Sequence, residues 1–345
     1  AADLTPGQET RLPLGGRIAA GHPLAEPALR GHAYRIFTGA PVPASLDTVI
    51  MQEDCREDNG AVILPASVKA GGNIRRAGES VKIGSVPLAA GTLLGPQHIG
   101  VAATLGLTAL PVRRRLRVAI FSTGDEIRDP GQPLPPGCLY DANRYTLTGL
   151  LTASGCDVTD LGILPDRLEA IRDTLDRAAA GHDLIVTSGG VSVGAEDHVK
   201  AAVQALGSLY LWRLALKPGK PLALGEVKGT AFLGLPGNPV AVMVTFLLFA
   251  RPLIARLSGA TFRPQRRYPL PAAFTLKKKA GRREFPRARI VQTAFGPVVE
   301  LLKGDSSGVL TSMSSAEGFV DLPEAAMDIV PGDSVAFLPF SEAMP

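Results

Sequence analysis

The segment that decides the fold is RVAIFSTGDE, residues 117–126. Its first half is a short, mainly apolar run of the kind that forms a strand buried on both faces of a sheet. Two hydroxyl residues, a glycine and two acids follow at once. Loops that leave the carboxyl ends of parallel strands often contact ligands, so we predict a buried parallel strand with a polar, ligand-contacting loop after it.

Downstream of this segment, stretches with helical spacing alternate with short apolar runs. The predicted helices are 143–154, 167–180, 197–206 and 239–257, and the predicted strands are 158–164, 183–187 and 231–235. This alternation predicts a parallel sheet with helices on both faces. The longest apolar run, 240–250, is too short to span a bilayer and precedes Arg251-Pro252, so we predict a buried helix and no membrane partner.

Both flanks of this region have β character. The runs Tyr34–Phe37, Thr48–Met51 and Ala61–Leu64 are separated by turn signals, and similar runs stand at 289–292, 298–301 and 334–337. A helix is expected at 95–107. We therefore predict an α/β multidomain protein, in which an N-terminal β module and a C-terminal β-barrel domain flank the central parallel-sheet domain. The expected boundaries are 1–78, 79–112, 113–260 and 261–345.

Composition excludes several classes. Of 345 residues, 46% are hydrophobic and 20% are charged, and the net charge is +4, which fits a soluble protein and favours anionic ligands only slightly. The basic runs contain no interleaved aromatics, so no nucleic-acid partner is expected. The three cysteines are far apart, which indicates neither a disulfide framework nor a zinc site and fits the cytoplasm. The chain opens without methionine, and we expect a segment upstream of Ala1.

Four predicted loops should meet at one edge of the sheet, because the carboxyl ends of parallel strands lie together. They contain four carboxylates, and Mg²⁺ commonly takes one or two of these with waters and substrate phosphates. Each acid taken alone could instead cap a helix. The acids are Asp125, Glu126, Asp166 and Asp197.

The loop Ser188–Gly194 (SGGVSVG) is the most specific of the four. Glycines let backbone N–H groups approach an anion, and the next helix adds partial positive charge. The alternative is a glycine turn made only for packing, since this is neither a dinucleotide fingerprint nor a P-loop.

Basic residues lie in two further segments. Lys217 and Lys220 are predicted to lie in a loop stiffened by proline and glycine, which would suit fixed charges facing an oxyanion. Arg75 could bind phosphate. The alternatives are a solvated lysine and a surface turn. Asn238 precedes Pro239 and a helix, so capping is its simpler role.

Together these strings resemble the molybdopterin molybdenumtransferases, the family that includes bacterial MoeA and the E domain of gephyrin. The matching segments are 35–43, 73–78, 121–126, 140–144, 188–194, 217–221 and 235–239. They follow the family order over nearly the whole chain. The resemblance implies a MogA-like, molybdopterin-binding central domain and, at 79–112, the remnant of a helical dimerisation domain.

The resemblance implies an enzyme that inserts molybdate into adenylylated molybdopterin and releases AMP with Mg²⁺, in molybdenum cofactor synthesis. It implies a homodimer, and other proteins of that pathway are possible partners. The implied catalytic residues are Asp125, Glu126, Asp166, Asp197 and Lys217, of which Glu126, Asp166 and Asp197 hold the metal. The implied ligand-binding residues are Thr38, Arg75, Ser188, Gly189, Gly190, Ser192, Gly194, Arg213, Lys220, Pro236, Gly237, Asn238 and Pro239.

Three departures from the family pattern stand out. The acidic Met-Asp-Gly-Tyr-Ala segment of the family is absent, Gly-Glu-Asp is Gly78-Glu79-Ser80, and Trp-Lys is Trp212-Arg213. Two rival functions stay open. A molybdopterin adenylyltransferase shares the sheet domain but does not need the flanking β modules, and a scaffold of the gephyrin type does not need the carboxylates.

Overall fold

The computed structural model describes residues 1–191, 198–302, 308 and 310–343. The chain folds into two units, Ala1–Pro87 and Leu88–Pro345. The finer domain boundaries expected from the sequence stay predictions.

The first unit contains a four-stranded sheet in the order β2-β1-β4-β3. Strand β1 (Thr10–Ile18) is parallel to β2 (Ala33–Ile36) and antiparallel to β4 (Ala61–Leu64), which also pairs with β3 (Arg56–Asp58). A short 3-10 helix, η1 (Gln52–Asp54), precedes β3. The predicted β module is therefore present, with strands close to two of the three expected runs.

The strand predicted at Thr48–Met51 is wrong. A turn takes up the polar groups that a strand would need: the Val49 N–H donates to the Gly72 carbonyl at 3.1 Å, and the Asn73 side-chain amide donates to the Val49 carbonyl at 2.9 Å. Because both backbone groups of Val49 bond to this turn, they cannot also enter a strand ladder.

The second unit is built around a six-stranded sheet in the order β10-β12-β13-β9-β5-β8. Strands β13, β9, β5 and β8 are mutually parallel, as predicted. Strands β10 and β12 extend the sheet antiparallel, which the sequence did not indicate. The bounds are β5 (Arg117–Thr123), β8 (Asp157–Leu164), β9 (Leu184–Ser188), β10 (Gly207–Arg213), β12 (Pro221–Val227) and β13 (Thr230–Leu235).

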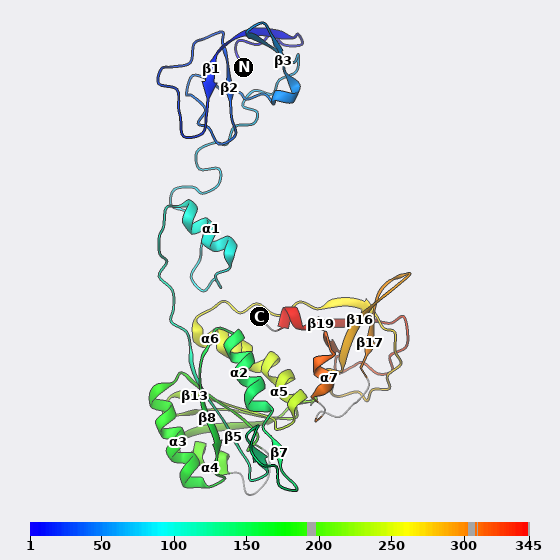
Figure 1. Ribbon diagram of the computed structural model, residues 1–345. Helices are drawn as coiled ribbons and strands as arrows, with labels where there is room; N and C mark the ends of the chain where they lie inside the picture. The colour runs from blue at the N-terminus through cyan, green and yellow to red at the C-terminus, as the bar shows by residue number, and fades with distance from the viewer. Residues whose placement is uncertain (192–197, 303–307, 309, 344–345) are drawn as a thin grey trace. The chain divides into compact units, whose positions relative to one another are not determined.

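Helices cover both faces of this sheet (Figure 1). One face carries α2 (Asn143–Ala153) and α5 (Pro239–Thr245), and the other carries α3 (Leu168–Gly181) and α4 (His198–Leu206). Successive residues of β5 enter the two cores alternately: Val118 and Ile120 pack with the first pair of helices, and Ala119 and Phe121 with the second. The prediction of a strand buried on both faces is thus confirmed.

The long apolar helix continues from α5 through a π-helical turn, η2 (Phe246–Ala250), into α6 (Arg251–Ser258). Among the described residues, this helix alone is long and apolar enough to cross a membrane by length and composition, and 56% of its most apolar 18-residue stretch is buried inside the protein. The helix predicted at 239–257 is therefore confirmed, and so is the burial of its apolar run 240–250. Such burial is typical of a core helix.

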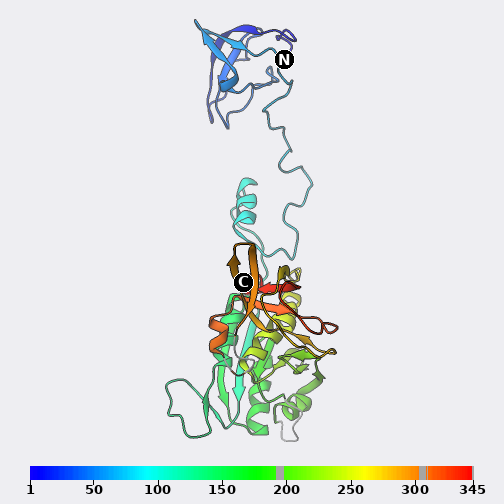
Figure 2. The same cartoon turned by 90° about the vertical axis from the view of Figure 1, so that its right-hand side faces the viewer.

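The C-terminal part of the second unit contains a five-stranded antiparallel sheet, coloured yellow to red in Figure 2. A bridge between Ala272 and Val299 joins its two edges, while closure into the predicted barrel stays a prediction. The bounds are β14 (Tyr268–Pro271), β16 (Arg287–Thr293), β17 (Gly296–Leu301), β18 (Gly318–Asp321) and β19 (Ser334–Pro339), with helices α7 (Thr311–Ser314) and α8 (Phe340–Ala343).

Smaller elements complete the unit. Helix α1 (Pro96–Thr104) lies within the helix predicted at 95–107. Strands β6 (Ile127–Arg128) and β7 (Leu139–Tyr140) form one pair, and β11 (Leu216–Lys217) and β15 (Arg283–Glu284) form another.

Candidate functional site

The predicted meeting of loops is present. Because β13, β9, β5 and β8 are parallel neighbours, the segments that follow them leave the sheet at one edge. These segments are 236–239, 189–191, 124–126 and 165–166, as far as the structure describes them. We call this the loop edge.

The acidic residues of the loop edge are accessible. Asp125 and Glu126 are exposed and follow Gly124, whose φ of +145° a residue with a side chain rarely adopts. Asp166 is half-buried, and its carboxylate accepts a bond of 3.4 Å from Thr123 Oγ1 at the end of β5. The neighbouring strand therefore orients Asp166 while leaving most of its bonding capacity free.

The predicted magnesium ligands cannot all be compared with the structure, because Asp197 lies outside the described residues. Within those residues, no group of three His, Cys, Asp or Glu side chains lies close enough to hold a metal ion. Glu126 and Asp166 supply the hard carboxylate oxygens that Mg²⁺ prefers. The set of Glu126, Asp166 and Asp197 stays a prediction.

The glycine loop owes part of its sequence to packing. A Cβ at Gly190 would lie 2.7 Å from Val199 Cγ2 and 2.9 Å from Thr123 Cγ2, and the residue has a φ of +62°. The Gly189 N–H donates to the Leu235 carbonyl at 3.1 Å. Ser192 and Gly194 lie outside the described residues, so their predicted ligand contacts stay predictions.

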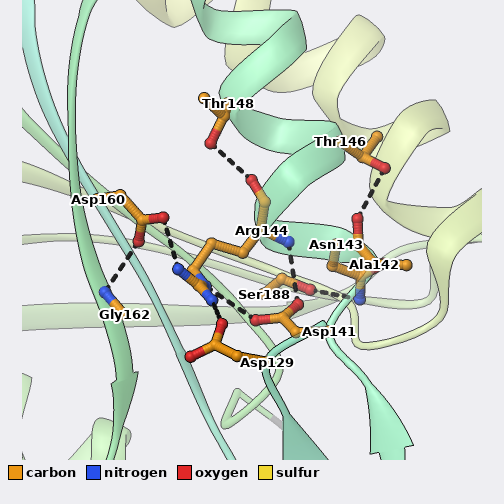
Figure 3. A network of polar contacts seen from close by, with 10 residues as sticks. All are labelled: Asp129, Asp141, Ala142, Asn143, Arg144, Thr146, Thr148, Asp160, Gly162 and Ser188. Carbon is orange, nitrogen blue, oxygen red and sulfur yellow. Dashed lines mark hydrogen bonds and ion pairs between the residues drawn. The ribbon is translucent and has the colours of Figure 1, made fainter. Parts of the chain in front are cut away.

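Ser188 is buried at the end of β9 and bonds within the protein (Figure 3). Its hydroxyl donates to the Pro236 carbonyl at 3.1 Å and accepts from Asn143 Nδ2 at 2.8 Å. The same amide donates to the Gly237 carbonyl at 2.6 Å. Asn143 was included in a family string but not in the predicted site, because its two partners, Ser188 and Gly237, lie far away in the sequence.

Next to Asn143, Arg144 is buried among three carboxylates (Figure 3). Its guanidinium donates to Asp141 at 3.1 Å and to Asp160 at 2.5 Å, and it also pairs with Asp129. Burial by itself would lower the pKa of Arg144, but the hydrogen bonds that it donates to Asp160 and Asp141 outweigh burial and raise that pKa above its usual value. We call these four residues the Arg144 clamp.

A cleft of 390 Å³ opens beside the loop after β13. It is lined by residues of segments 214–221, 236–241 and 282–287, and we call it the cationic cleft. Four of its lining side chains are basic and one is acidic, namely Lys217, Lys220, Arg282, Arg287 and Glu284. Arg282 and Arg287 were missed, because nothing near them in the sequence marks them as different from other basic residues.

Lys217 was predicted to lie in a loop. The structure instead places it in the short strand β11, which pairs with β15. Its ammonium lies 3.2 Å from the buried carboxylate of Glu284, which Arg282 approaches to 3.8 Å. Lys220 is exposed in the turn before β12. Arg213 ends β10 with an exposed side chain, so its predicted ligand contact stays a prediction.

The loop after β13 contributes to the cationic cleft through Pro236, Gly237 and Asn238. Asn238 occupies the position before α5, but its side chain makes no capping hydrogen bond and is exposed. Capping therefore does not explain this amide. Pro239 begins the helix, where its missing N–H costs nothing.

Two predicted ligand contacts, Thr38 and Arg75, belong to the first unit. Thr38 lies in a turn directly after β2, and both side chains are exposed. Both can therefore meet a ligand, and their roles stay predictions.

Three family models match successive parts of this chain. Residues 1–106 match the MoeA N-terminal region (domain I and II), residues 119–256 a probable molybdopterin binding domain, and residues 269–340 the MoeA C-terminal region (domain IV). The order is that expected from the sequence strings.

Individual proteins agree with these models. The molybdopterin molybdenumtransferase of Haemophilus influenzae is 36% identical over 340 residues, which cover 98% of this chain and 84% of that protein. Molybdopterin molybdenumtransferase 2 of Mycobacterium tuberculosis is 35% identical over 95% of this chain and 82% of its own length. The solved molybdopterin biosynthesis moeA protein from Pyrococcus horikoshii OT3 has a TM-score of 0.79 at 26% identity, covering 96% of this chain and 81% of its own.

The parallel sheet with its loop edge and the matches to residues 119–256 define an α/β protein of the molybdopterin-binding class. More narrowly, the chain belongs to the molybdopterin molybdenumtransferase family, a family of transferases in molybdenum cofactor biosynthesis. The resemblance drawn from the sequence is thereby confirmed.

Proposed function

We propose that this chain inserts molybdate into adenylylated molybdopterin and releases AMP, with Mg²⁺ held at the loop edge. One observation carries the proposal: the loop Pro236–Asn238 borders both candidate sites. It lines the cationic cleft, and Gly237 packs next to Gly189 of the glycine loop. An enzyme that joins two anionic substrates needs adjacent sites of this kind.

The loop edge suits the adenylylated pterin. The described part of the glycine loop, residues 188–191, lies beside the first turn of α4, where Gly190 packs against Val199, and a helix start favours phosphate oxygens. Asp125, Glu126 and Asp166 lie in the loops that follow the adjoining strands β5 and β8, and their accessible oxygens fit a divalent cation. When bound, Mg²⁺ would neutralise phosphate charge.

The cationic cleft suits molybdate. Lys217, Lys220 and Arg282 supply positive charge, and the exposed amide of Asn238 supplies N–H donors. Donors fixed before the reaction stabilise developing charge without having to reorient. Glu284 balances Lys217 in the absence of an oxyanion and keeps the ammonium in place.

Two product assays test the proposal. Given adenylylated molybdopterin, molybdate and Mg²⁺, the protein should release AMP and yield active cofactor. Given molybdopterin and ATP, it should form no adenylate. Adenylate formation from ATP would show an adenylyltransferase instead, and no turnover in either assay would favour a scaffold.

Variants of the loop edge sharpen the test. Glu126→Gln and Asp166→Asn should each lower the rate of AMP release, by about 10²-fold or more, because a metal ligand or water-positioning carboxylate is lost. Asp157→Asn is a matched control, since it removes one exposed carboxylate from the opposite end of β8. If all three variants released AMP at the wild-type rate, Glu126 and Asp166 would have no role in the mechanism.

We further propose a cytoplasmic homodimer. Exposed apolar side chains near α1, among them Ile99, Leu105 and Leu107, support a protein contact there. Light scattering that gives a monomer mass at micromolar concentration would contradict it.

A further inference from the structure

We infer that Asn143 is a positioning residue that fastens the glycine loop to the loop of the cationic cleft. The inference rests on the proposed function, because it concerns how the two substrate sites are held relative to each other. Asn143 is the first residue of α2, and α2 packs on β5, β8 and β9 directly below the loop edge.

The Asn143 amide joins two loops that are far apart in the sequence. Its Nδ2 group has two protons: one goes to Ser188 Oγ at 2.8 Å, and the other to the Gly237 carbonyl at 2.6 Å. Ser188 passes the connection on by donating to the Pro236 carbonyl at 3.1 Å. The Asn143 amide thereby links the end of β9, through the Ser188 bond that Figure 3 shows, to the loop after β13.

The Arg144 clamp fixes the position from which Asn143 projects. Arg144 follows Asn143 on α2 and bonds to Asp129, Asp141 and Asp160, which come from segments on two sides of the helix start. The Arg144 N–H also donates to Asp141 Oδ1 at 3.1 Å. The first turn of α2 is therefore anchored independently of the two loops.

Stability alone does not account for this asparagine. Its Oδ1 atom is buried and has no hydrogen-bond partner among the residues that the structure describes. An unsatisfied buried amide oxygen costs free energy. We therefore assign the two N–H bonds a role in holding together the two loops that they join. Both loops border a proposed substrate site.

The effect on catalysis follows from geometry. Asn143 does not itself line the cationic cleft and bonds to residues of the two loops, so its loss should shift the loops against each other more than it weakens either site. Misplacement of reacting groups by about 1 Å can lower a rate by about 10²-fold. We expect kcat to fall at least about tenfold, with each KM changed less than about threefold.

The experiment compares Asn143→Asp and Asn143→Ala with Thr148→Ala in the complete chain. Asp has nearly the shape of Asn but cannot donate when ionised, so it removes the bonds and keeps the packing. Thr148 lies on the same helix and donates to the Arg144 carbonyl of that helix, at 2.8 Å. Steady-state kinetics, thermal unfolding and hydrogen exchange of segments 184–191 and 231–240 are measured for each variant.

The inference predicts faster exchange of both segments and the kcat loss in the two Asn143 variants, with wild-type values for Thr148→Ala. Wild-type kcat in Asn143→Asp, or unchanged exchange, would overturn it. If Asn143→Ala unfolds, Asn143→Asp decides the matter. If the wild-type protein released no AMP, the proposed function would fail, while the exchange measurement would still decide whether Asn143 fastens the loops.

Discussion

Lys217 Nζ lies 3.2 Å from Glu284 Oε2 inside the cationic cleft, and the carboxylate is buried while the lysine is half-exposed. The ammonium can therefore turn toward a bound anion, whereas Glu284 is confined beside it. An oxyanion that enters the cleft must compete with Glu284 for the same cation.

Opposite effects on molybdate affinity are expected from changing the two partners. Lys217→Met should weaken binding by about tenfold, because an anion loses a nearby cation, whereas Glu284→Gln should strengthen it, because a competing charge is removed. Both effects should shrink at high salt. Calorimetry with molybdate alone measures both.

The control for charge is Lys228→Met. Lys228 lies outside the cleft and pairs with Asp176, so its loss changes net charge equally. Weakening of the same size in Lys217→Met and Lys228→Met would show that the cleft does not hold the anion.

The Arg144 clamp should be important for stability. Arg144→Met leaves three carboxylates facing one another, one of them fully buried. Removing one partner of a buried ionic cluster costs about 3–5 kcal/mol, and we expect about 3 kcal/mol here because Asp129 and Asp160 are partly solvated. Urea unfolding would measure it, and a loss below about 1 kcal/mol would contradict the account.

Gly190 and Gly149 should respond oppositely to the same substitution. Gly190→Ala should destabilise by about 1–3 kcal/mol, because the new methyl meets Val199 and Thr123 and the φ is positive. Gly149→Ala lies in α2 with open space around it and should stabilise by up to about 1 kcal/mol. Thermal unfolding of both variants checks the pair.

A pH dependence is expected at the opposite edge of the sheet. Arg114 donates to both carboxylate oxygens of Asp183, at 2.6 and 2.7 Å, and holds the pKa of Asp183 well below its usual range. A depressed carboxyl pKa stabilises the fold above the unfolded pKa of about 3.9 and loses that contribution as pH falls through the folded value.

Asp183→Asn should therefore be less stable than the wild type at about pH 7, and the difference should narrow below about pH 4. Urea midpoints at several pH values measure it. A difference that stays constant over this range would assign the effect to packing instead of charge.

The loop edge could be predicted from the sequence because the pattern of apolar residues locates the strands. In a parallel sheet, the loops after neighbouring strands then lie at the same edge. Val118 to Phe121 alternate between two apolar cores, which an uninterrupted apolar run predicts well. Strands β10 and β12 were not predicted, because the Pro218-Gly219 pair between them is typical of a loop, and their pairing with each other and with β13 is set by tertiary contacts.

The other features of the site that were not predicted from the sequence depend on contacts between residues that are distant in the sequence. Asn143 meets Ser188 and Gly237, and Lys217 meets Glu284, through tertiary packing that no local pattern encodes. Ser188 was expected at the ligand because it follows a strand. Its buried hydroxyl already bonds on both sides, a fact that sequence position cannot reveal.

The pairing of β11 with β15 fixes the width of the cleft by main-chain hydrogen bonds, including the one from the Phe285 N–H to the Lys217 carbonyl at 2.8 Å. Backbone bonds do not depend on which side chains stand beside them. The side chains that line the cleft can therefore be substituted one at a time, in evolution or by design, without altering the dimensions of the cleft. A change of preference between oxyanions of similar size would need only different side chains on the same β11–β15 backbone.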